Sequence, residues 1–368
     1  MSPHDPDGAL TVLQGFPVPR PTTNPYLVML AQSLRDQPGV TVLPFSWRTA
    51  ILGRYDVYHS HWPEILVGGR TPLRMLVRQL LVLVFLAKLA LFRIPIVRTV
   101  HNVGLPDGLN RRERALLALI DRRTAVRIVL NPETPVPAGA AVELIPHGHY
   151  RDWFAGQPRS ERVPGRAAFT GLIRRYKGVE SLIAAFQEAH RADPSLSLTI
   201  GGRPTSPELE SVVRQAASAG SGVEATLRHL DDAELVAAVT AAELVVLPYR
   251  FMHNSGGVLA ALSLDRPVLV PRNAVNEALS REVGPGWVLF FDGELSASSL
   301  RDALEGVRST ARAVSPDLSA RGWERTGGAH VRAYRRAIAL THKRRARDGE
   351  PATTSTASAR TEPREVTP

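Results

Sequence analysis

Short runs of apolar residues alternate with longer stretches of helical spacing along most of the chain. In the first half, β-like runs are expected at residues 10–13, 40–44, 57–59, 96–100, 125–130 and 142–145. Apolar residues with helical spacing lie between them, at residues 25–35, 73–92 and 111–121. This alternation is typical of parallel βαβ units.

The same alternation begins again after residues 156–166, a segment rich in Gly, Pro and charge that we interpret as a linker. Strands are expected at residues 167–170, 196–200, 225–227, 244–248, 267–270 and 288–291, with helices at 179–192, 207–217, 231–241 and 256–264. Ligands of such sheets bind at the carboxyl ends of the strands. We therefore predict an α/β fold with two Rossmann-like, doubly wound domains that face a cleft.

The pattern divides the 368 residues into four parts. We expect an N-terminal domain over residues 1–157, a C-terminal domain over 158–329, and a helix over 330–347 that returns to the N-terminal domain. Residues 348–368 are rich in Ser, Thr and Pro and have almost no large apolar side chains, so a disordered tail is predicted there.

The amino-acid composition excludes some kinds of site and indicates the charge of the partner. The chain has no cysteine, which excludes disulfides, thiolate zinc sites and cysteine nucleophiles. It carries 45 Lys and Arg against 35 Asp and Glu, a formal charge of +10 that favours an anionic partner. A nucleic acid is not expected to be that partner, because aromatic residues make up only 6% and the cations are spread over helices and the tail.

The most apolar stretch, residues 73–92, contains Arg74, Arg78 and Lys88 and is therefore not expected to span a membrane. On a helical wheel the three cations form one stripe, which suits a helix lying on an anionic membrane surface. The alternative is an ordinary crossover helix packed on the sheet. The first residues lack a signal-peptide pattern, so we expect a cytoplasmic protein, peripheral on the inner face of the plasma membrane.

The loop after the seventh expected strand reads GLIRRYKG, residues 171–178. Its cations Arg174, Arg175 and Lys177 lie at a strand end, beside the beginning of a helix, where they suit a pyrophosphate. The alternative is a solvated basic loop.

A second loop leads from Leu247-Pro248-Tyr249 into another helix. Asn254 or Ser255 is expected to cap this helix, and the adjacent Gly256 and Gly257 let a ligand approach the backbone N–H groups. The alternative is an ordinary capped helix. Two anion sites at one sheet edge favour the functional interpretation.

These loops, in this order, resemble the large retaining family of GT-B glycosyltransferases that contains many bacterial mannosyl- and glucosyltransferases. Further matching segments are DVYHSHWPE at residues 56–64, RTVHN at 98–102, IPHGHY at 145–150 and LPYR with NSGG, ALS and RPV at 247–268. The resemblance covers roughly residues 10 to 340. Met252 and Ala260 stand where members commonly have two glutamates, and Asn254-Ser255-Gly256 is expected to substitute, as in a subset of the family. The resemblance therefore leaves retention or inversion open.

The resemblance implies that Lys177, assisted by Arg174 or Arg175, neutralises a donor diphosphate, and that the N–H groups of residues 255–257 complete the site. No Asp-x-Asp pair follows a strand, so no metal and no cofactor besides the nucleotide-sugar is expected. The loops that hold Arg203 and Arg228 are expected to border the nucleobase.

The first half is expected to hold the acceptor and the reacting sugar. His101, which follows a strand, is predicted to contact the donor sugar or the attacking hydroxyl, unless it is a structural histidine of the sheet edge. If the reaction inverts, Glu64 or Asp107 is the expected carboxylate base. Other residues predicted to line the acceptor side of the cleft are Asn24, His61, Trp62, Asn102, His147 and His149.

The predicted function is transfer of a hexose from a nucleotide-diphosphate sugar, GDP-mannose or a UDP-sugar, to a lipid-linked or other glycan acceptor. Two alternatives stay open at this point. One is a sugar-nucleotide epimerase of the same fold, which requires a buried pair of acid and base carboxylates. The other is an inactive homologue that only binds the sugar nucleotide.

Overall fold

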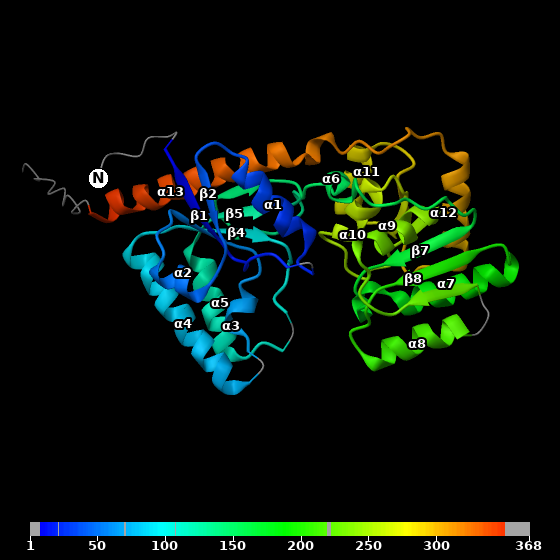
Figure 1. Ribbon diagram of the computed structural model, residues 1–368, viewed down its shortest axis with the longest axis horizontal. Helices are drawn as coiled ribbons and strands as arrows, with labels where there is room; N and C mark the ends of the chain where they lie inside the picture. Colours follow the sequence, from blue (N-terminus) through cyan, green and yellow to red (C-terminus); the bar gives the residue numbers. More distant parts are fainter. Residues whose placement is uncertain (1–7, 21, 70, 107, 219–221, 350–368) are drawn as a thin grey trace, which may run out of the picture.

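The computed structural model describes residues 8–349 except residues 21, 70, 107 and 219–221. Two α/β domains lie side by side, each built on a six-stranded sheet (Figure 1). Every strand that the apolar runs predict is present, and all strand pairs are parallel. The fold is therefore the predicted pair of doubly wound α/β domains.

The N-terminal sheet has the strand order β2-β1-β3-β4-β5-β6. Its strands are β1 (Leu10–Gln14), β2 (Val40–Leu43), β3 (Val57–Ser60), β4 (Ile96–Val100), β5 (Thr124–Val129) and β6 (Val142–Leu144). Its helices are α1 (Pro25–Arg35), α2 (Trp47–Leu52), α3 (Glu64–Val67), α4 (Pro72–Leu91) and α5 (Arg111–Arg123). Asn110 and Glu113 form a capping box at the beginning of α5.

The C-terminal sheet has the order β12-β11-β10-β7-β8-β9. Its strands are β7 (Arg166–Thr170), β8 (Ser197–Gly201), β9 (Val223–Thr226), β10 (Leu244–Val246), β11 (Val268–Pro271) and β12 (Val288–Phe291). The helices are α6 (Arg151–Phe154), α7 (Val179–Ala192), α8 (Pro207–Ser218), α9 (Asp232–Ala241), α10 (Gly256–Ser263), α11 (Ala274–Val283) and α12 (Ala297–Ser309), with short 3-10 turns η1 (Arg175–Lys177) and η2 (Ser319–Arg321).

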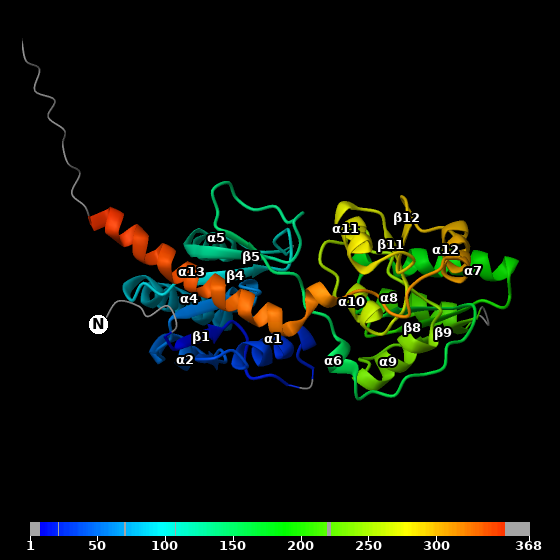
Figure 2. The same ribbon diagram turned by 90° about the horizontal axis from the view of Figure 1, so that it is seen from above.

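The last helix, α13 (Trp323–Gly349), leaves the C-terminal domain and lies along the N-terminal domain (Figures 1 and 2). It begins seven residues before the position expected for it. Its buried residues Val331, Ala333, Tyr334 and Ala337 join the same apolar cluster as Leu30 of α1. Residues 350–368, most of the predicted disordered tail, lie outside the described residues.

The cations expected to form a stripe on the surface of α4 are in part bonded to neighbouring segments of the protein. Lys88 Nζ donates to the carbonyl oxygens of Gly53 at 2.5 Å and Ala50 at 2.9 Å, and Arg78 Nη1 donates to Gly68 O at 2.8 Å. Two of the three cations therefore donate hydrogen bonds to backbone carbonyl oxygens that need a donor.

The outer face of α4 is apolar. Exposed side chains recur along it at helical spacing, namely Leu73, Leu76, Val77, Leu80, Leu83, Val84 and Leu91. We call these seven residues the α4 apolar face. Within the described residues, no helix is long and apolar enough to cross a membrane.

Candidate active-site cleft

The two loops predicted to bind a diphosphate touch each other. Gly178 has φ of +68°, and a Cβ at this position would overlap the carbonyl oxygen of Pro248, so only glycine fits there. Arg250 N donates to Tyr176 O at 2.9 Å. The loops after β7 and β10 therefore form one surface at the carboxyl ends of adjacent strands.

Lys177 is half-buried on this surface. Its ammonium lies 5.0 Å from the centre of the Tyr249 ring, a cation–π distance. Burial, with a smaller contribution from the nearby Arg174, lowers the pKa of Lys177 to about 8. A desolvated cation is poorly hydrated and gains more from an anionic ligand than an exposed one does. Arg174 and Arg175 are exposed beside it.

The N-terminus of α10 is the second half of the predicted diphosphate site. Ser255 caps the helix by accepting from Val258 N at 3.3 Å. A Cβ on Gly256 would lie 3.2 Å from Tyr150 Oη, and one on Gly257 would lie 3.4 Å from Tyr249 Oη. The two glycines therefore let the tyrosine hydroxyls lie close to the beginning of the helix, and the N-terminus of a helix favours an anion.

Of the two residues predicted to cap α10, Asn254 does not cap it, but it lines the cavity and bonds across the two domains. Its Nδ2 donates to the carbonyl oxygen of His101 at 3.0 Å, and its Oδ1 accepts from Asn131 Nδ2 at 2.7 Å. His253 also crosses to the N-terminal domain, since its Nε2 lies 2.8 Å from Thr134 Oγ1. The side chain of Asn254 thus joins the two domains beside the predicted diphosphate site. The sequence motifs pointed to neither Asn131, Thr134 nor this role of His253.

His101 lies at the N-terminal wall of the cleft, after β4. Trp62 stacks on its ring, with 4.2 Å between ring centres and 18° between planes. His61 Nδ1 is 3.1 Å from His101 Nε2. One face of Trp62 is therefore covered by protein, which leaves only its other face for the predicted contact with a sugar.

A cavity of about 900 Å³ lies between the domains. From the N-terminal domain, residues 101–106 line it, including the predicted His101 and Asn102; from the C-terminal domain, Arg174, Tyr176, residues 249–255 and residues 271–273 line it. The cavity therefore brings the predicted donor and acceptor sides together.

Six residues predicted on the N-terminal side lie outside the lining of this cavity: His61 and Trp62, which contact His101, and Glu64, Asn24, His147 and His149. Glu64 begins α3, and burial raises its pKa. Asn24 caps α1. His147 is buried against Tyr26, 4.4 Å between ring centres, and His149 lines a separate cavity of about 420 Å³. Asp107 lies outside the described residues.

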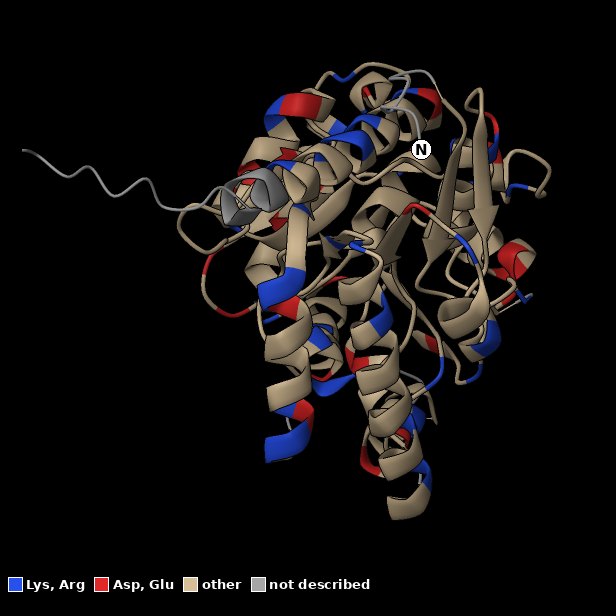
Figure 3. Cartoon of the chain, turned by 90° about the vertical axis from the view of Figure 1, so that its left-hand side faces the viewer, with Lys and Arg blue, Asp and Glu red and all other residues tan. Residues whose placement is uncertain are grey.

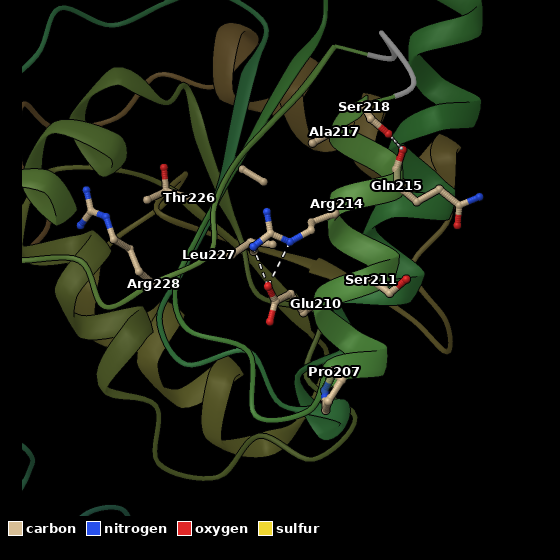
Figure 4. Close-up of a pocket in the computed structure, with 11 residues that line it drawn as sticks. Pro207, Glu210, Ser211, Arg214, Gln215, Ala217, Ser218, Thr226, Leu227 and Arg228 are labelled. Carbon is tan, nitrogen blue, oxygen red and sulfur yellow. Dashed lines mark hydrogen bonds and ion pairs between the residues drawn. The ribbon is translucent and has the colours of Figure 1, made fainter.

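The two arginines predicted near the nucleobase are both exposed. Arg228 makes a two-pronged ion pair with Glu234, with Nη1 and Oε2 2.7 Å apart. It also lines a groove of about 1140 Å³ between α8 and β9, where Figure 4 shows Arg214 paired with Glu210 and Arg228 to one side of them. The Arg203 backbone carbonyl accepts from Ile173 N, which ties the loops after β7 and β8 together.

Across the part of the chain that the structure describes, no three His, Asp or Glu side chains are grouped so that they would hold a metal ion. The arginines in the lining of the cavity between the domains are Arg174, Arg250 and Arg272, and Lys177 lies outside this lining.

Comparisons with known proteins agree with this geometry. The family model described as "Glycosyl transferases group 1" matches residues 164–307. A GDP-mannose:glycolipid 4-beta-D-mannosyltransferase of Xanthomonas campestris pv. campestris is 44% identical over 329 residues, which are 89% of this chain and 93% of that protein.

Solved structures share the fold. Sucrose-phosphate synthase from Thermosynechococcus elongatus has a TM-score of 0.55 at 16% identity, over 92% of this chain and 98% of that one. Anabaena Alr3699/HepE in complex with UDP and glucose has a TM-score of 0.57 at 14% identity, over 92% and 99%. The chain belongs to the group 1 glycosyltransferases and has their GT-B fold.

Proposed function

We propose that this enzyme transfers mannose from GDP-mannose to a glycolipid and forms a β-linkage to the acceptor. The observation that carries the proposal is the 44% identity to a mannosyltransferase whose name states this donor, acceptor class and linkage. The loops of the cleft support it, because Lys177 and Gly257 at the N-terminus of α10 both lie beside Tyr249, and a cation next to a helix N-terminus suits a diphosphate.

The proposed linkage defines the stereochemistry. The mannose of GDP-mannose is α-linked to phosphate, so a β-linked product means inversion at C1. The acceptor hydroxyl then attacks from the face opposite the diphosphate and must lose its proton to a base. Lys177 and the α10 N–H groups stabilise the departing diphosphate, so the proposed reaction needs no metal and is expected to continue in EDTA.

Donor binding tests the proposal first. GDP and GDP-mannose are expected to raise the melting temperature of the protein, with and without EDTA, more than UDP, ADP and their sugar conjugates do, because a ligand of the native state stabilises it. Radiolabel from GDP-mannose should then enter a lipid extract of membranes in a form released by β-mannosidase and not by α-mannosidase. Stabilisation by UDP alone, or an α-linked product, contradicts the proposal.

The acceptor of the proposed reaction lies in a membrane, and the α4 apolar face suits contact with lipid. Its side chains are large and lie along one side of the helix; Leu80 is 54% exposed and Leu91 74%. Exposed arginines lie on α4, just after it and on the neighbouring helix α5, namely Arg74, Arg93, Arg111, Arg112 and Arg114. Figure 3, which looks onto the N-terminal domain, shows long uncharged stretches of helix interrupted by a few Lys and Arg segments. An apolar face flanked by arginines is the pattern of a helix that lies in an anionic membrane surface.

Vesicle binding checks this part of the proposal. Replacing Leu76, Leu80 and Val84 by serine is expected to lower binding to anionic phospholipid vesicles about tenfold or more, because apolar area no longer leaves water. A matched control replaces Leu144, Val212 and Val314, which are exposed away from α4, by serine. Equal binding of the two triple variants in co-sedimentation would contradict a role for α4 in contact with lipid.

A further inference from the structure

A chain of hydrogen bonds connects the C-terminal helix to the wall of the cleft. Gln14 Nε2 donates to Tyr334 Oη at 3.4 Å, and Gln14 Oε1 lies 3.2 Å from His61 Nε2. His61 Nδ1 then lies 3.1 Å from His101 Nε2. Gln14, His61 and Tyr334 are fully buried, whereas His101 is partly accessible and lines the cavity.

The chain assigns protons to the two histidine rings. Gln14 Oε1 is only an acceptor, so His61 Nε2 carries the hydrogen in that bond. A neutral His61 then has no hydrogen on Nδ1, and His101 must donate to it through Nε2. Consequently Nδ1 of His101 carries a lone pair. Within the described residues, this Nδ1 has no hydrogen-bond partner and is not among the buried orphan atoms.

The rings of His61 and His101 are both uncharged at neutral pH. Burial lowers the pKa of His61 and His101 well below its usual range, with each histidine's neighbours adding to the effect. Both rings are thus neutral, which is the state that accepts a proton. The stack on Trp62 and the edge of Tyr26, 5.3 Å between ring centres, fix the orientation of the His101 ring.

We propose that His101 is the base of the transfer and that His61, held by Gln14, is the positioning residue that keeps its Nδ1 free to accept the proton. This rests on the inverting mannosyl transfer proposed above. As the acceptor oxygen bonds to C1, the C1–O bond to the diphosphate breaks and GDP leaves with the electron pair. The acceptor proton moves to His101 Nδ1, and the imidazolium that forms is stabilised by the adjacent negative charge of GDP.

Glu64, the carboxylate predicted for this role, fits it less well. Glu64 is the first residue of α3 and does not line the cavity, whereas His101 does. A base must reach the hydroxyl directly or through one water, so position in the cavity decides between the two.

Substitutions at His61 separate positioning from packing. His61→Leu removes the acceptor of the His101 bond and is expected to lower kcat on the order of 10- to 100-fold, below the 10²–10⁴ of a complete general base. KM for GDP-mannose should change less than about threefold. His61→Asn, whose amide oxygen can accept from His101 Nε2, should restore most of the rate. A matched control, His330→Leu, removes another buried histidine of this region that makes no bond to His101.

Nuclear magnetic resonance of ring-labelled histidine tests the tautomer directly, with His101→Ala used to assign the signal. The expected form of His101 is protonated on Nε2 in the wild type and in His61→Asn, and mixed in His61→Leu. His101 protonated on Nδ1 in the wild type, or equal rate losses in His61→Leu and His330→Leu, would overturn the proposal. Stabilisation by GDP in all folded variants shows that such a failure concerns the base and not the donor. Absence of GDP binding in the wild type instead refutes the proposed function.

Discussion

Replacing Lys177 by methionine is expected to lower kcat by about 10² to 10³, the usual effect of removing one group that stabilises charge in a transition state. Lys177 Nζ is the half-buried cation of the donor side, 5.0 Å from the Tyr249 ring centre. Methionine keeps most of the side-chain volume and removes the charge, so the departing diphosphate loses its partner. Steady-state rates with GDP-mannose measure the effect, and circular dichroism verifies the fold.

The pH dependence gives the same test in the wild type. The pKa of Lys177 is lowered to about 8, so the free enzyme loses this positive charge as the pH rises through about 8. The ratio kcat/KM, which reports the free enzyme, is expected to fall over that range. Lys177→Arg should move the decline to higher pH, because arginine stays charged. Arg191→Met, an exposed cation at the end of α7, is the control. Wild-type activity in Lys177→Met would refute the assignment of Lys177 to the diphosphate.

Gly178→Ala is the second substitution with a large expected effect. The new Cβ would overlap the Pro248 carbonyl oxygen, and φ of +68° is unfavourable for alanine. We expect unfolding free energy to fall by about 2–5 kcal/mol, from backbone strain plus overlap with a rigid neighbour. Because the two loops proposed to bind the diphosphate touch at this point, affinity for GDP should fall as well.

Gly293→Ala is the matched control for Gly178→Ala. Gly293 has φ of +67°, but a Cβ there meets nothing within 4 Å among the described residues. It should therefore cost only the conformational strain, about 1–2 kcal/mol. Urea unfolding of both variants measures the difference. Equal losses of unfolding free energy in Gly178→Ala and Gly293→Ala would mean that the contact between the loops after β7 and β10 adds no stability. The contact would then not organise the proposed donor site.

Local sequence patterns predicted the strands well. Each strand of a parallel sheet is a short apolar run bounded by turn residues, so its position can be predicted without knowledge of its partners. The prediction for β9 was displaced, at residues 225–227 instead of Val223–Thr226. The pattern does not predict the short helices α2, α3 and α6 or the helices α11 and α12. The beginning of α13 was placed too late, because Gly327 and Gly328 interrupt its helical pattern.

The cleft was predictable only in part. Lys177, Ser255 and Gly256 belong to continuous motifs at strand ends, and a motif of this kind is visible in the sequence. The bonds of Asn254 to His101 and Asn131 join residues more than 120 positions apart, and so does the bond of Tyr334 to His59. No spacing rule encodes such pairs.

Two sequence interpretations change with the structure and the family. The helical wheel places the three cations of α4 on one side of the helix. It cannot show that Arg78 and Lys88 bond to backbone carbonyl groups of neighbouring segments. The sugar-nucleotide epimerase, left open by the sequence, is set aside because the chain belongs to the group 1 glycosyltransferases.

Helix α13 also determines when the N-terminal domain can complete its folding during synthesis. This helix is the last described element of the chain, yet Tyr334 and Ala337 complete the core around Leu30 and Ile128. Because these residues follow the whole C-terminal domain in the sequence, the N-terminal domain can complete its core only after that domain has been synthesised. Premature termination before Trp323 would leave the apolar side chains around Leu30 exposed to water, so such fragments should aggregate instead of accumulating as a folded half.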